Sequence, residues 1–182
     1  MEKFRVNAED SIFLIVDIQE KLMPAVVSGD MVCKKIDMML HVANSMDIPV
    51  VITEQYPKGL GLTLPEIRGF AQDDMILEKM QFSAFIPDLE KMLIKLSRKT
   101  IILAGVETHI CVYQTARDLV DKGYSVHVLL DATSSRTHAN YENGLSLMKS
   151  AGCLISNTET VLFDLMKSAA SPHFKFISKL VK

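Results

Sequence analysis

One stretch of the sequence decides which fold we expect for this chain. It reads Ile101-Ile-Leu-Ala-Gly-Val-Glu-Thr-His-Ile-Cys-Val-Tyr-Gln-Thr-Ala-Arg-Asp118. Its first half is an apolar, β-branched run that stops at Gly105, which predicts a strand and a tight turn. Its second half predicts a helix, because apolar residues recur with helical spacing at Ile110, Val112, Ala116 and Leu119. Cys111 then lies in the first helical turn, where unpaired N–H groups and the helix dipole favour a thiolate.

The composition limits the classes of function. The chain has 182 residues, 48% of them hydrophobic and 23% charged, so we expect one globular domain over residues 1–182. A net charge of −2 argues against nucleic-acid or membrane partners and favours a small-molecule substrate. Three unpaired cysteines and the lack of an apolar leader predict a reducing compartment, the cytoplasm, with an organelle such as the mitochondrion left open.

Outward from residues 101–118, strand-like and helix-like segments alternate along the chain. This alternation predicts a three-layer α/β/α, doubly wound fold around a mostly parallel six-stranded sheet. A long loop is expected from Glu54 to Asp74, a Ser/Thr-rich turn from Thr133 to Thr137, and a tail from Pro172. The expected strands cover residues 11–18, 48–53, 75–79, 100–105, 124–130 and 153–156. The expected helices cover residues 31–46, about 87–96, 138–151 and 159–168, and one more helix has Cys111 in its first turn and ends at about residue 122.

Three chemically useful residues lie at or just after the ends of predicted strands. Asp17, Lys79 and Cys111 are therefore expected at one edge of the sheet, where doubly wound folds bind ligands. A carboxylate can take the proton of a thiol, and a nearby ammonium stabilises both the carboxylate and a thiolate. Backbone N–H groups near Glu107 and Cys111 are expected to stabilise an oxyanion. Such a site would hydrolyse an amide or similar C–N bond through a thioester.

Each of these residues also has a plainer interpretation. Asp17 is of a type that often caps the turn after a strand, and Lys79 could be a solvated charge at a strand end. Cys111 could be a small buried hydrophobic residue. The residues alone leave both interpretations open.

Four motifs follow one another along the chain: Leu14-Ile-Val-Asp-Ile-Gln19, Glu78-Lys79 with Phe82-Ser-Ala-Phe85, Ala104-Gly-Val-Glu-Thr-His-Ile-Cys-Val112, and Asp131-Ala-Thr-Ser-Ser-Arg136. In this order they resemble the isochorismatase-like cysteine hydrolases, the group that includes nicotinamidases and N-carbamoylsarcosine amidase. The resemblance covers nearly the whole chain, and the chain looks like a subgroup of small isochorismatase-domain hydrolases. It implies that Asp17 is the base, Lys79 the charge-stabilising residue and Cys111 the nucleophile.

Two further expectations come from this resemblance. Relatives have a cis peptide before the residue that matches Glu107, which turns its N–H toward the oxyanion. Metal-binding nicotinamidases carry an Asp-x-His pair and a further His in a region where this chain has no His, from residue 44 to residue 98. We therefore expect no metal and no other cofactor.

The remaining expectations concern the pocket and the partners. Substrate-pocket residues are expected at the rim, with ordinary packing as the alternative for each: Gln19, Gln55, Tyr56, Phe82 and His109. His109 is not expected to pair with Cys111, because residues two apart on a helix point away from each other. The Ser134-Ser135-Arg136 cluster either binds an anion or forms a turn and helix start.

Relatives commonly form homo-oligomers, so we expect one here. Two other functions stand beside the hydrolase. One is a non-catalytic scaffold that uses an apolar tail including Phe174 and Phe176. The other is a ribonuclease, which the balanced charge disfavours.

Overall fold

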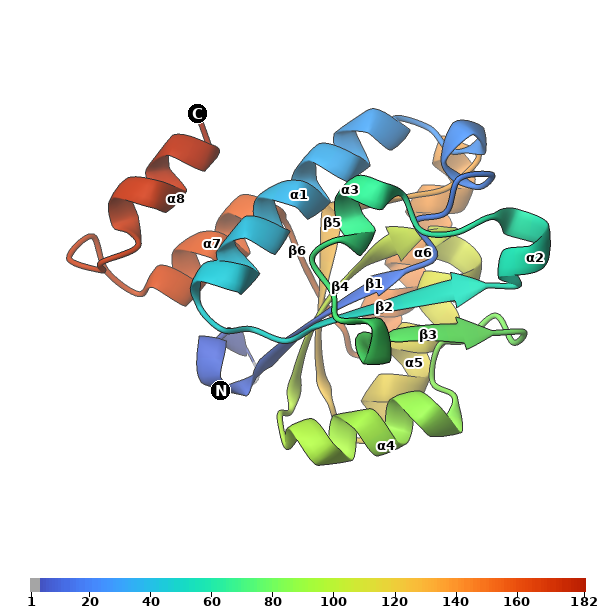
Figure 1. The fold of residues 1–182 in the computed structure, drawn as a ribbon, viewed down its shortest axis with the longest axis horizontal. Coiled ribbons are helices and arrows are strands. Elements are labelled where there is room, and N and C mark those ends of the chain that lie inside the picture. The colour runs from blue at the N-terminus through green and yellow to red at the C-terminus, as the bar shows by residue number, and fades with distance from the viewer. Residues whose placement is uncertain (1–3) are drawn as a thin grey trace.

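Six parallel strands form the centre of the protein in the computed structural model, which describes residues 4–182 (Figure 1). All strand pairings in this sheet are parallel, and the order is β3-β2-β1-β4-β5-β6. The strands are β1 (Ser11–Val16), β2 (Val50–Gln55), β3 (Ile76–Lys79), β4 (Thr100–Val106), β5 (Ser125–Ser134) and β6 (Leu154–Ser156). The predicted α/β fold with six strands is confirmed.

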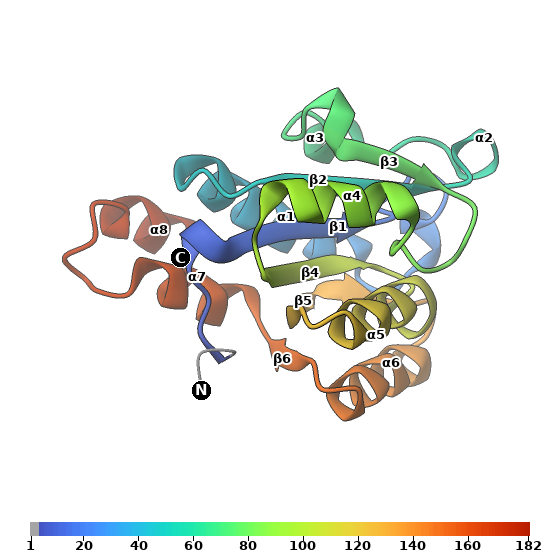
Figure 2. The same ribbon diagram turned by 90° about the horizontal axis from the view of Figure 1, so that it is seen from below.

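Helices cover both faces of the sheet, as Figures 1 and 2 show. The described helices are α1 (Gly29–Ser45), α2 (Pro57–Leu60), α3 (Pro65–Arg68), α4 (Pro87–Leu96), α5 (Tyr113–Asp121), α6 (His138–Ser150), α7 (Thr158–Met166) and α8 (Phe174–Leu180). The long helices α1 and α7 pack on one face, and α4, α5 and α6 pack on the other.

Strand β1 shows why the sheet is buried on both faces. All six of its residues are buried, as expected of a central parallel strand. Phe13 and Ile15 belong to the core under α1 and α7, whereas Ile12 and Leu14 belong to the core under α4 and α5. Alternate side chains thus supply the two halves of the core.

The order of the strands fixes the place of a ligand site. The chain adds β2 and β3 on one side of β1, and then crosses to add β4, β5 and β6 on the other side. Strand order therefore reverses between β1 and β4. A crevice for a ligand is expected beyond the carboxyl ends of these two strands.

Several predicted boundaries differ from the observed ones. The segment from residue 54 to residue 74 is not one long loop, because α2 and α3 each form one turn that begins at a proline. Strand β5 runs on to Ser134, so it includes Asp131 and part of the predicted turn. The tail forms α8, whose Ile177 is completely buried. Within residues 4–182, no helix combines the length and apolar character needed to cross a membrane.

Candidate active site

The carboxyl edge of the sheet brings three of the predicted residues together. Asp17 follows β1, Lys79 ends β3, and Cys111 lies in the π-helical turn Thr108–Val112 after β4. Lys79 Nζ lies 2.7 Å from Asp17 Oδ2, and the Cys111 thiol is within hydrogen-bonding reach of the same carboxylate. The structure thus places a carboxylate between an ammonium and a thiol.

Asp17 is held by residues from two other strands. Its backbone has a left-handed φ of 58°, and its side chain is completely buried. Thr53, within β2, donates its hydroxyl to Asp17 Oδ1 at 2.8 Å, so each carboxylate oxygen has a partner. Burial raises the pKa of Asp17 above its ordinary value, although the Lys79 ammonium opposes this shift. A raised pKa makes the carboxylate a stronger base.

Lys79 is a buried cation that is surrounded by oxygen atoms. Besides Asp17, its ammonium donates to Gln55 Oε1 at 2.7 Å and to the carbonyl oxygens of Phe82 and Gln81 at 3.0 and 3.3 Å. Buried charges are stable only when they are paired and hydrogen-bonded in this way. The segment after β3 is therefore fixed to the ammonium by its own carbonyl groups.

The environment of the Cys111 thiol disfavours its ionised form. Burial and the neighbouring Asp17 carboxylate raise its pKa to about 12, and the Lys79 ammonium only partly offsets them. This corrects the expectation that helix dipole and ammonium keep the sulfur ionised. That expectation came from sequence position, which does not show that the thiol is buried against a carboxylate.

The turn before Cys111 depends on a glycine. Gly105 has a φ of 143°, and a Cβ atom there would lie 2.3 Å from the carbonyl oxygen of Val16, so no larger residue fits between β4 and β1. The expected cis peptide before Glu107 is wrong, because the peptide bonds of the described residues are trans. The chain instead turns through a left-handed Glu107 with a φ of 42°. The backbone N–H groups of Glu107 and Cys111 stay a prediction as oxyanion donors.

Two of the five residues expected at the rim, Gln19 and Gln55, instead hold other parts of the site in place through hydrogen bonds. Gln19 is completely buried, and its side chain donates to the carbonyl oxygens of Gln55 and Gly61 while accepting from the Gln55 N–H. Gln55 in turn accepts from Lys79 and donates to the carbonyl oxygen of Met80. Tyr56 and Phe82 are about half exposed at the same edge of the sheet, consistent with a rim.

His109 lies in the turn Thr108–Val112 and faces the connection after β5. Its Nδ1 is 3.1 Å from Ser135 Oγ and 3.4 Å from Glu107 Oε2. The cluster after β5 is a turn and helix start, since Ser134 donates to the carbonyl oxygen of Val27 and Thr137 caps α6 by accepting from the Asn140 N–H. Thr53 could not be singled out from the sequence, because threonine is common within strands and β2 continues to Gln55.

Within residues 4–182, His, Cys, Asp and Glu side chains do not converge in groups of three or more that could hold an ion.

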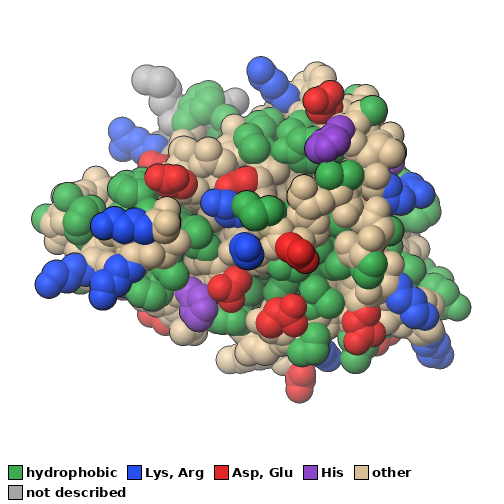
Figure 3. Space-filling view, turned by 90° about the horizontal axis from the view of Figure 1, so that it is seen from above, with side chains coloured by type: hydrophobic (Ala, Val, Ile, Leu, Met, Phe, Trp, Pro, Cys, Tyr) green, Lys and Arg blue, Asp and Glu red, His purple; other side chains and the backbone are tan. Residues whose placement is uncertain are grey.

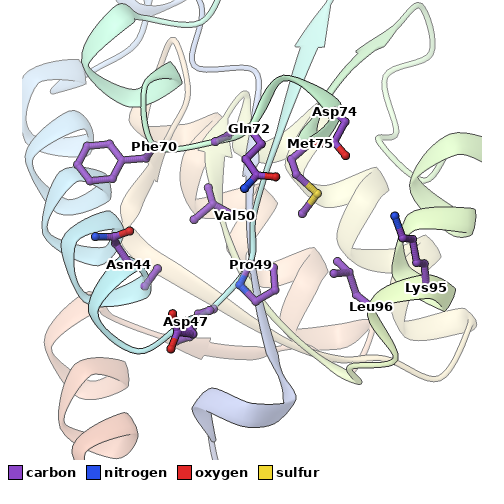
Figure 4. A pocket seen from close by; sticks show the side chains of 13 residues that line it. Asn44, Asp47, Pro49, Val50, Phe70, Gln72, Asp74, Met75, Lys95 and Leu96 are labelled. Carbon is purple, nitrogen blue, oxygen red and sulfur yellow. The ribbon is translucent and has the colours of Figure 1, made fainter.

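Two cavities help to place the site. A cavity of about 430 Å³ lies at the opposite, amino edge of the sheet, among Pro49, Val50, Met75 and Leu96 (Figure 4). It is separated from the triad by the length of the strands. A cavity of about 390 Å³ is lined by β3 and the segment after it, including Lys79, Gln81 and Pro87. The second cavity is the one that adjoins a residue of the triad.

Comparisons with known proteins show which family this chain is similar to. Residues 11–160 match the family model described as the isochorismatase domain. Rat isochorismatase domain-containing protein 2 is 40% identical over 179 residues, which cover 98% of this chain and 84% of that protein.

Two solved structures share the fold. A structure described as MAR1 ribonuclease from Caenorhabditis elegans is 35% identical, with a TM-score of 0.92 over 97% of this chain and 92% of that one. The YcaC gene product of Escherichia coli, described as an octameric hydrolase of unknown specificity, is 22% identical, with a TM-score of 0.91 over 97% and 88% of the two chains. The YcaC likeness supports the fold alone.

Proposed function

Because this chain belongs to the isochorismatase family and has a hydrolase fold of that family, we propose that it is a metal-independent cysteine hydrolase of small amide-like substrates. In this proposal Cys111 is the nucleophile, Asp17 the base and Lys79 the residue that stabilises the charge. The observation that carries the proposal is the position of Asp17 between the Lys79 ammonium and the Cys111 thiol.

The pKa of Cys111 decides how the first step proceeds. With a pKa of about 12, the free thiolate is about 10⁻⁵ of the protein at pH 7. A preformed thiolate would therefore be scarce. Asp17 removes this obstacle by accepting the thiol proton while the sulfur attacks the carbonyl carbon.

The remaining steps use the same carboxylate. As the tetrahedral intermediate collapses, the C–N bond breaks and Asp17 returns the proton to the leaving nitrogen, which leaves a thioester on Cys111. A water molecule then attacks the thioester, and Asp17 accepts its proton. The C–S bond breaks, the sulfur is protonated again, and a carboxylic acid is released. Lys79 holds Asp17 in place and compensates its charge throughout.

The burial of the site limits the substrate. Cys111 is 6% exposed, and Asp17 and Lys79 are buried beside it. A small, unhindered carbonyl group can reach such a sulfur more easily than a polymer can. This supports a small-molecule substrate.

The test is hydrolysis of a small activated amide, p-nitroacetanilide. We expect acid-quenched protein to carry an acetyl group on Cys111, and we expect Cys111→Ala to lose both the acetyl group and the release of p-nitroaniline. Cys153→Ala is the matched control, since Cys153 is also buried but lies at the amino edge before β6. Turnover by Cys111→Ala at the rate of the natural chain would reject the proposal.

Ribonuclease activity is a second candidate, because the similar C. elegans structure is described as a ribonuclease. The surface does not favour it: no continuous basic stripe crosses the face in Figure 3, and the net charge is −2. A labelled single-stranded RNA tests this candidate. Cleavage that Cys111→Ala abolishes would support a ribonuclease over an amidase.

We also propose that the chain forms a homo-oligomer in the cytoplasm. Exposed apolar side chains near the carboxyl edge support self-association: Tyr56, Leu62, Met80 and Phe82. The similar YcaC protein is described as octameric. Light scattering after size-exclusion chromatography measures the subunit number, and a mass equal to that of one chain would contradict the proposal.

A further inference from the structure

Glu107 presents an electrostatic problem beside the nucleophile. Its backbone forms the turn into the Cys111 segment, and its side chain is only 10% exposed. A buried carboxylate repels any negative charge that forms nearby, and Glu107 is one of the charges that raise the pKa of Cys111. A site that must develop an anion at Cys111 needs this carboxylate to be neutralised.

Arg136 is placed to neutralise it. Its Nε lies 2.7 Å from Glu107 Oε1, and the residue comes from the connection between β5 and α6. The Arg136 side chain is 56% exposed, so only its inner side is in contact with the carboxylate. A guanidinium keeps its charge over the whole ordinary pH range, which makes the compensation permanent.

The second carboxylate oxygen of Glu107 has weaker partners. Glu107 Oε2 is buried and has no hydrogen-bond partner within residues 4–182, although His109 Nδ1 lies 3.4 Å away. His109 Nδ1 also faces Ser135 Oγ at 3.1 Å. Arg136 is therefore the stronger of the two partners of this carboxylate.

We propose that Arg136 is a positioning residue, which neutralises Glu107 so that the negative charge formed at Cys111 during the reaction is not opposed by a buried carboxylate. The inference rests on the proposed function in one respect, that Cys111 is the nucleophile. It assigns Arg136 no contact with the substrate.

The test measures the reactivity of Cys111 directly. Iodoacetamide reacts with the thiolate, so its rate at the Cys111 peptide, followed by mass spectrometry over a series of pH values, reports the thiolate fraction. In Arg136→Gln we expect the rate at a fixed pH to fall about tenfold and the profile to move about one pH unit upward. Arg117→Gln is the matched control, since Arg117 pairs with Asp118 on the surface of α5, and we expect it to change nothing.

Rescue separates this charge effect from a merely structural one. In the double variant Glu107→Gln/Arg136→Gln, position 107 no longer carries a buried carboxylate that needs a counter-charge. We therefore expect the rate of iodoacetamide alkylation at Cys111 to return to that of the natural chain or above. Arg136→Lys, which keeps the charge, should retain most of the rate.

An unchanged profile in Arg136→Gln, or a failure of Glu107→Gln to rescue it, would overturn the inference. These outcomes are distinct from failure of the proposed function. If Cys111 never forms an acyl intermediate but the Arg136 profile still moves and is rescued, the proposed function fails while the charge relation between Arg136, Glu107 and Cys111 stands.

Discussion

The two edges of the sheet use polar residues in different ways. At the carboxyl edge, Asp17, Lys79 and Glu107 are buried charges that bind one another or their neighbours. At the amino edge, Asp10 accepts from the Lys99 N–H and the Thr100 hydroxyl, and Arg98 donates to the carbonyl oxygens of Ala8 and Ser11. The amino-edge contacts satisfy the backbone hydrogen-bonding groups of loops next to solvent. The carboxyl-edge contacts keep charged groups in place where water is excluded, and such buried charges are typical of functional sites.

Left-handed backbone follows the same division. At the amino edge, Asp47 and Ser97 are left-handed just after α1 and α4, where helices commonly end in this way. At the carboxyl edge, Asp17, Tyr56 and Glu107 are left-handed just after strands. A non-glycine residue in this conformation costs roughly 1–2 kcal/mol. At the carboxyl edge, this conformation directs the Asp17 carboxylate to Lys79 and begins the turn that carries Cys111.

The largest expected difference between the edges is at the two aspartates. We expect Asp17→Asn to lower amide hydrolysis by about 10²–10⁴-fold, because the base is removed. The variant should also lose about 3–5 kcal/mol of unfolding free energy, because Lys79 is left buried without its counter-charge. Asp10→Asn should retain full activity and cost about 1 kcal/mol. Urea unfolding and p-nitroaniline release measure both quantities; equal losses in the two variants would remove the distinction between the edges.

Two glycines give the next comparison. Gly105→Ala places a Cβ atom 2.3 Å from the Val16 carbonyl oxygen, so we expect a loss of about 3 kcal/mol or more in unfolding free energy. Gly123, before β5, also has a positive φ, but a Cβ atom there meets nothing within 4 Å. Gly123→Ala should therefore cost about 1 kcal/mol. Similar melting temperatures for the two variants would show that β1 and β4 can separate.

Two glutamines give a smaller difference. Gln55→Ala removes one partner of the buried Lys79 ammonium, which we expect to cost about 1.5–3 kcal/mol and to lower activity. Gln72 lines the cavity at the amino edge and is exposed (Figure 4). Gln72→Ala should change unfolding free energy by about 0.5 kcal/mol or less. If Gln55→Ala hydrolysed the amide at the rate of the natural chain, Lys79 would need no hydrogen bond from β2.

The smallest difference concerns alkaline pH. The pKa values of Cys111 and Cys153 are raised from 9.0 to about 12 and about 11. Above pH 9 the unfolded chain loses these protons first, so each thiol lowers stability as the pH rises through its window. Up to pH 10.5 both folded thiols stay mostly protonated while the unfolded thiols ionise, so Cys111→Ala and Cys153→Ala should each remove about 2 kcal/mol of this alkaline loss, with little difference between them. Guanidinium unfolding between pH 8 and pH 10.5 measures the loss; an alkaline loss that Cys111→Ala leaves unchanged would show that burial and Asp17 do not raise the pKa of Cys111.

The sequence was informative where periodicity and strand ends carried the signal. Helix α4 begins and ends where Pro87 and the apolar spacing predict, and the central strands β1 and β4 are continuous apolar runs. The positions of Asp17, Lys79 and Cys111 followed from strand ends alone. The one-turn helices α2 and α3 were not predictable, because proline and glycine also mark loops.

Side-chain direction and burial set the limit of sequence reasoning. Gln19 follows a strand, like a rim residue, but its amide is used completely by the backbone of the next loop. The protonation of Cys111 depends on burial and on a carboxylate from a distant segment, neither of which local position reveals. Both are tertiary properties.

The central claim is that Asp17 takes the proton of Cys111, and the rate of adduct formation with a small aldehyde tests it most directly. The thiol adds across the C=O bond, so the reaction needs the sulfur and its base but no leaving group. We compare the natural chain with Asp17→Asn combined with Lys79→Met, which leaves no buried charge unpaired and protects folding. We expect adduct formation at Cys111 to be about 100-fold slower or more in the double variant, and we expect Asp10→Asn to leave the rate unchanged. A folded double variant that forms the adduct as fast as the natural chain would contradict it.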